Sequence, residues 1–206
     1  MSSQARNALM DRRRFSPHDP TVARSLVGLA NVPTIVALGP FDVRADAYQL
    51  AAAFTSVQRT CPAQLVLLGT GLFRSAVARY ALDHDEQPRV HLAHAVSPHR
   101  WSELLAAADV LVPSTSSGAT GLLEALAMGR PVVASANAVS ARLLMPSSAG
   151  LIYRQGDVPG MAQALRRLLT TPALRQGMGT RATQVARRQR LQGIDFRQHD
   201  EGEDHG

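Results

Sequence analysis

Short apolar runs alternate along the chain with segments whose apolar residues recur at helical spacing. Runs of three to six such residues predict strands buried on both faces, because buried parallel strands lose the polar alternation of exposed ones. These predicted strands cover residues 34–39, 65–68, 90–93, 110–112, 131–134 and 150–153. The intervening spacing predicts helices over 44–59, 72–80, 98–108, from about 119, over 140–144, after Asp157 and over 172–189. Strands that alternate with helices indicate an α/β fold with a doubly wound, Rossmann-like parallel sheet.

Composition divides the chain into three parts. Residues 1–33 are polar, Arg-rich and punctuated by prolines, and they form a lead-in with a short helix over 21–29. Residues 34–191 form a single α/β domain. Residues 192–206 end in HDEGEDHG, an acidic sequence expected to be disordered.

Charge and cysteine content limit the classes of partner. The chain has 206 residues and a net charge of +6, and its basic residues are all arginine. The arginines are scattered and aromatic residues are few, so we do not expect nucleic-acid binding. The single Cys61 fits a reducing compartment, no apolar run approaches a membrane span, and the histidines lack metal-ligand spacing. We therefore expect a cytoplasmic protein without a transmembrane segment, metal or cofactor.

Small residues follow three of the predicted strands. They are Gly39 after the first, Gly69 and Gly71 after the second, and 114–118 after the fourth. Ligands bind at the carboxyl ends of the strands in such sheets, and a helix that opens there presents free backbone N–H groups to an anion. The pattern indicates one crevice for a nucleotide-type ligand. Ordinary turn glycines are the alternative explanation.

The segment GLLEALAMGRPVVAS at 121–135 resembles the signature of the C-terminal domain of GT-B retaining glycosyltransferases of the family 4 group. That signature reads E-x7-E followed by A-M-A-x-G-x-P-V-V-A-S. The resemblance extends over about residues 10–190. It also rests on Met10-Asp11, Phe15 and Pro17 as a linker, on Gly69-x-Gly71 with Arg74, on Ala107 to Val110, and on Gly150-Leu151-Ile152 with Gly156-Asp157.

The resemblance assigns roles to particular positions. The second Glu of the pattern holds the ribose hydroxyls of the nucleotide, and this residue is Glu124. The first Glu contacts the donor sugar, and its place is taken by Ser116, the candidate catalytic position. The Arg and Lys that neutralise the diphosphate are replaced by Pro40 and Ala45.

Nearby groups are candidates to replace those two cations. Arg44 adjoins the Lys position and Arg74 follows the Gly69 turn, where either side chain could bind a phosphate. The backbone N–H groups of 118–120, contributed by Gly118, Ala119 and Thr120, would add to the same anion site. The structural alternatives are an exposed helical Glu124, ordinary surface arginines, and a hydroxyl-rich helix entry with Ser117 as its cap.

The resemblance implies a nucleotide-sugar donor-binding half of a glycosyltransferase. Because family enzymes have two domains and this sequence begins at the linker, we expect transfer to need an acceptor-domain partner or a missing N-terminal half. The alternative is a non-catalytic binding or assembly module that keeps the scaffold.

Overall fold

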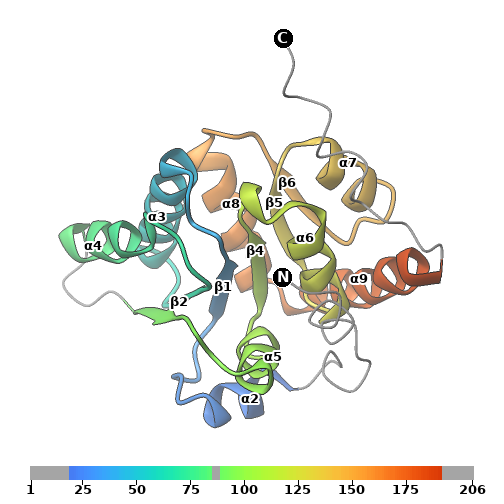
Figure 1. The fold of residues 1–206 in the computed structure, drawn as a ribbon, viewed down its shortest axis with the longest axis horizontal. Coiled ribbons are helices and arrows are strands. Elements are labelled where there is room, and N and C mark those ends of the chain that lie inside the picture. The colour runs from blue at the N-terminus through green and yellow to red at the C-terminus, as the bar shows by residue number, and fades with distance from the viewer. Residues whose placement is uncertain (1–18, 85–88, 192–206) are drawn as a thin grey trace.

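The computed structural model describes residues 19–84 and 89–191, and it contains a parallel β-sheet with helices on both faces (Figure 1). The strand order is β3-β2-β1-β4-β5-β6. The central pairings set Ile35 of β1 opposite Leu65 of β2 and Val110 of β4. The strand bounds are β1 Thr34–Leu38, β2 Gln64–Leu68, β3 Val90–Ala93, β4 Val110–Pro113, β5 Val132–Ser135 and β6 Gly150–Tyr153. This confirms the predicted doubly wound sheet.

Two apolar cores cover the two faces of the sheet. One face packs against α3, α4 and α8, and the other against α2, α5, α6, α7 and α9. Successive side chains of a strand point to opposite faces of the sheet. In β1, Ile35 and Ala37 therefore belong to one core and Val36 and Leu38 to the other, which explains why the whole strand is apolar. The helix bounds are α2 Pro20–Leu26, α3 Arg44–Gln58, α4 Arg74–His84, α5 Pro98–Ala106, α6 Gly118–Ala127, α7 Ala138–Leu144, α8 Val158–Thr170 and α9 Pro172–Leu191, with a 3-10 turn η1 at Thr115–Ser117.

The helix starts follow ordinary capping chemistry. Ser97 accepts a hydrogen bond from the Arg100 backbone N–H at the start of α5, and Asp157 accepts one from Gly160 at the start of α8, as predicted. The helix predicted over 72–80 begins two residues later than expected. Leu72 lies in the turn before α4 and is 85% exposed, so it does not belong to the apolar side of the helix. The Phe73 N–H donates a hydrogen bond to the Phe41 carbonyl. This contact holds the turn in place up to Arg74, where α4 begins.

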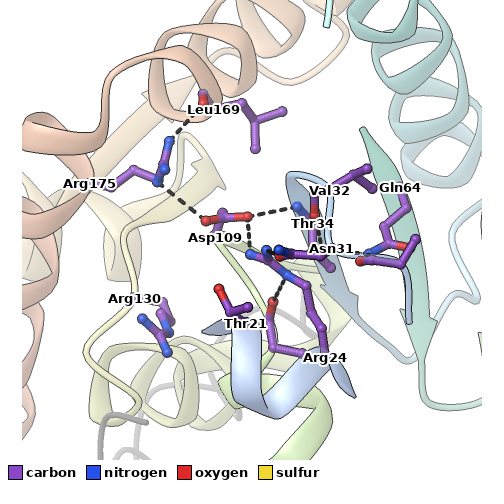
Figure 2. A network of polar contacts seen from close by, with 12 residues as sticks. Thr21, Arg24, Asn31, Val32, Thr34, Gln64, Asp109, Arg130, Leu169 and Arg175 are labelled. Carbon is purple, nitrogen blue, oxygen red and sulfur yellow. Dashed lines mark hydrogen bonds and ion pairs between the residues drawn. The ribbon is translucent and has the colours of Figure 1, made fainter. Parts of the chain in front are cut away.

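A buried ionic network closes the amino end of the sheet (Figure 2). Asp109 Oδ2 accepts hydrogen bonds from Arg24 Nη2 at 2.5 Å and from the Thr34 backbone N–H at 2.8 Å. Arg175 Nε lies 3.4 Å from the other Asp109 oxygen. The network joins α2, β1, β4 and α9, so α2 is packed into the domain although it falls in the predicted lead-in. The predicted linker residues Met10 to Pro17 and the acidic tail lie outside the described residues.

Candidate functional site at the carboxyl edge of the sheet

The glycine turns after β1 and β2 pack directly against each other. The Gly39 N–H donates to the Leu68 carbonyl at 2.9 Å, and the Phe41 N–H donates to Thr70 at 2.9 Å. Gly71 has a φ of +138°, and a Cβ built on it would lie 2.3 Å from the Phe41 nitrogen. These contacts bring Gly39, Gly69 and Gly71 together, as predicted. They also explain the glycines by turn-to-turn packing, so a role in ligand binding stays a prediction.

Both predicted replacement cations have partners outside the middle of the crevice. The Arg44 guanidinium is exposed and lies 5.4 Å from the ring centroid of Tyr48, on the same helix. Arg74 is half-buried and its Nη1 donates to the Gly69 carbonyl at 3.0 Å. Arg74 therefore remains beside the predicted crevice, whereas Arg44 lies along the outer surface of α3.

The hydroxyl-rich loop after β4 forms η1 and leads into α6. Ser117 stands at the N-cap position of α6, but its Oγ donates to the Ser114 carbonyl at 2.7 Å and makes no capping hydrogen bond. Gly118 has a φ of +58°, and α6 begins there. Ser116 and Thr120 are exposed and Ala119 is half-buried. The first N–H groups of an α-helix have no intrahelical acceptors, so 118–120 carry donors suited to an anion.

Glu124 lies in the second half of α6 and is partly buried. Burial raises the pKa of Glu124 to about 7, and the indole N–H of Trp101, in the first turn of α5, acts in the opposite direction. That indole nitrogen is buried and has no hydrogen-bond partner within 3.5 Å among the described residues, so burial is the main cause of the raised pKa. The contact of Glu124 is thus with α5, and its expected place beside the Gly39 and Gly69 turns stays a prediction. A desolvated carboxyl with this pKa is typical of binding sites.

A network that the sequence did not suggest fills the space beyond β1. The Asp46 carboxylate accepts hydrogen bonds from the Thr115 hydroxyl and from Gln155 Nε2, the latter at 3.2 Å. Burial, and secondarily Asp46, raises the pKa of Tyr153. The space lined by Pro40, Asp46, Thr115 and Tyr153 is only about 20 Å³. The position of Asp46 beside Ala45 is the signal that could have found it.

The large space at this edge lies between η1, α6 and α7. It is a cavity of about 610 Å³, and Gly118 and Ala119 are in its wall. The loop after β5 supplies the opposite wall with residues that the sequence analysis did not select: Ser135, Asn137, Ser140 and Arg142. These residues lie at or after the carboxyl end of a strand, which is the sequence feature that could have identified them as site candidates. A second cavity, of about 480 Å³, lies at the opposite end of the sheet beside Asp109.

Comparison with known proteins identifies the family. The model for "Glycosyl transferases group 1" matches residues 32–171. The chain belongs to this family. A monoacylated phosphatidylinositol monomannoside mannosyltransferase of Corynebacterium glutamicum, described as GDP-mannose-dependent, is 28% identical over 82% of the chain and 48% of its own length. The glycosyltransferase LpsE of Rhizobium meliloti is 30% identical over 74% of the chain and 44% of its own length. The chain thus spans about half the length of these relatives.

Solved structures place the chain among C-terminal GT-B-type domains. The C-terminal domain of the group 1 protein LpcC from Francisella tularensis has a TM-score of 0.75 at 13% identity, over 88% of this chain and 98% of that one. The lipopolysaccharide glycosyltransferase WaaG has a TM-score of 0.71 at 24% identity, over 85% of this chain and 48% of that one. The fold expected from the sequence is confirmed.

Within 19–84 and 89–191, no group of three or more His, Cys, Asp or Glu side chains is arranged to hold a metal ion. Over the same ranges, none of the helices combines the length and the apolar character needed to cross a membrane.

Proposed function

We propose that this chain supplies the nucleotide-sugar donor site of a glycosyltransferase and that transfer requires a second, acceptor-binding part. The observation that carries the proposal is Glu124, a carboxyl desolvated by burial on the helix whose first turn opens on the large cavity. Among the described residues, the structure records no ion pair to it. Ribose hydroxyls could donate two hydrogen bonds to this carboxylate and so compensate its burial.

The same helix supplies the second part of the proposed chemistry. Cleavage of a nucleotide-sugar bond leaves growing negative charge on the diphosphate. Free N–H groups at 118–120 are oriented donors for that charge, and donors of this kind contribute on the order of a few kcal/mol each to catalysis. We assign contact with the transferred sugar to Ser116, which is exposed on η1 beside this turn.

Related proteins agree with this chemistry. The Corynebacterium relative is described as using GDP-mannose, and a structurally similar protein, Anabaena HepE, was solved with UDP and glucose at a TM-score of 0.69 and 17% identity. These ligands belong to the two related proteins, and titration identifies the nucleotide and sugar of this chain.

A second candidate function is a non-catalytic binding module. Pro40 and Ala45 stand where family enzymes carry cations, and the adjacent Asp46 carboxylate fills the space beyond β1 with Thr115 and Gln155. A carboxylate at this place opposes a diphosphate by like-charge repulsion.

Calorimetric titration of the full chain with GDP, UDP, ADP and their sugars separates the two functions. Donor binding predicts saturable binding of at least one nucleotide diphosphate at millimolar concentration or below, and a loss of about tenfold or more in Glu124→Gln. The control is Asp83→Asn, an exposed carboxylate on α4. If the native chain binds none of the panel while the double variant Ala45→Lys, Ser116→Glu does, the chain is a module and the donor proposal fails.

A further inference from the structure

The glycine-turn side of the crevice leaves little room for a diphosphate. Arg44 lies over Tyr48 and Arg74 is bonded to the Gly69 carbonyl. On that side the space is about 20 Å³ and includes the Asp46 carboxylate. A diphosphate on the first turn of α6 would therefore have a negative group on one flank.

The opposite flank has room and the opposite charge. The cavity of about 610 Å³ extends from Gly118 and Ala119 to the loop after β5 and α7. Arg142, exposed on α7, is the charged side chain among the described residues that line it. The other polar lining groups are neutral hydroxyls and amides: Ser114, Thr115, Ser135, Asn137, Ser140 and Gln155.

Ser114 adds an independent indication of a ligand. Its hydroxyl oxygen is buried and, within the described part of the chain, has no hydrogen-bond partner. It stands at the end of β4, in the wall between the strand and the start of α6. Buried hydroxyls nearly always have a partner, so a bound acceptor such as a phosphate oxygen would complete this one.

We propose that Arg142 is the phosphate-binding cation of this chain, and that the diphosphate of the donor binds in the large cavity between the first turn of α6 and α7. This rests on the proposed donor function and adds the residue and the side of the crevice. Two N–H groups of one guanidinium can bind two phosphate oxygens at once, which suits Arg to this task. The lost cations after β1 would thus be replaced from α7.

The test compares three arginine variants of the full chain by titration with GDP, UDP, pyrophosphate, guanosine and uridine. Arg142→Gln should weaken binding of the preferred nucleoside diphosphate by about 10-fold to 100-fold and leave nucleoside binding unchanged. Arg44→Gln, at the start of α3, and Arg59→Gln, just after α3, remove the same charge elsewhere. Each should change the affinity for the nucleoside diphosphate by less than about threefold. Equal unfolding midpoints in urea establish that the variants are folded.

The possible failures are distinguishable. If the native chain binds a nucleoside diphosphate and Arg142→Gln binds it equally well, the assignment of Arg142 is overturned and the donor function stands. If Arg44→Gln carries the loss, the diphosphate lies on the glycine-turn side. If the native chain binds no nucleoside diphosphate, the donor function itself fails.

Discussion

Replacing Glu124 with Gln is expected to stabilise the ligand-free domain at neutral and alkaline pH. Burial holds the pKa of Glu124 at about 7, against an ordinary value of 4.5. Below pH 4.5 the carboxyl is protonated in both the folded and the unfolded chain, so its burial costs little. As the pH rises from 4.5 to 7 the unfolded chain ionises first, and the folded state loses stability until both are ionised.

The size of the loss follows from the two pKa values. At about 1.4 kcal/mol per pKa unit, the difference between the two pKa values corresponds to about 3 kcal/mol of stability. Partial solvent access reduces the expected loss to about 2 kcal/mol. Glu124→Gln removes the ionisation and keeps a side chain of similar shape. The variant should therefore match the native chain at pH 4 and exceed its free energy of unfolding by about 2 kcal/mol at pH 8.

Urea denaturation at pH 4, 6 and 8 measures this difference, and the chain carries its own probe. Trp101 is the single tryptophan and lies beside Glu124, so its fluorescence reports on this part of the domain. Asp83→Asn is the matched control for an exposed carboxylate. A difference between Glu124→Gln and the native chain that is the same at pH 4 and pH 8 would refute the reasoning.

Three further predictions concern the scaffold. Asp109→Asn should cost about 3–5 kcal/mol in urea denaturation, because it leaves Arg24 buried without its counter-charge; a cost below about 1 kcal/mol would contradict the network. Gly71→Ala should lose at least about 2 kcal/mol, through its positive φ and its contact with the neighbouring turn, whereas Gly177→Ala in α9, with its nearest neighbour 3.6 Å away, should be neutral or slightly stabilising. Cys61 is buried with a raised thiol pKa, so it should react with a thiol reagent only after unfolding; rapid reaction in the folded chain would count against its burial.

Periodicity was sufficient to predict the sheet and most helices because both faces of this sheet are covered. The four central strands β2, β1, β4 and β5 are therefore buried throughout and almost wholly apolar, and each helix keeps one apolar side. Leu72 shows the limit. Its place two residues before α4 fitted the helical spacing, but the contacts of the turn at Phe41 and Phe73 begin the helix later and leave it exposed.

The candidate site was less predictable because its groups interact across the sequence. Gly39 and Gly71 were selected correctly as neighbours, since both follow adjacent strands. Asp46 and Gln155 are 109 residues apart and meet only through the fold, and no local pattern indicates such a pair. Arg142 was missed for a similar reason, because a lone arginine after a strand gains meaning only from the cavity that it lines.

The indole N–H of Trp101 offers the most direct measurement of the central claim that a nucleotide ribose binds at Glu124. As the chain has one tryptophan, a ¹H–¹⁵N spectrum of the labelled protein has one indole signal from a tryptophan side chain. The account predicts that GDP or UDP shifts this signal in the native chain and not in Glu124→Gln. It would be contradicted if a nucleotide bound the native chain, shifted backbone signals elsewhere and left the Trp101 indole signal in place.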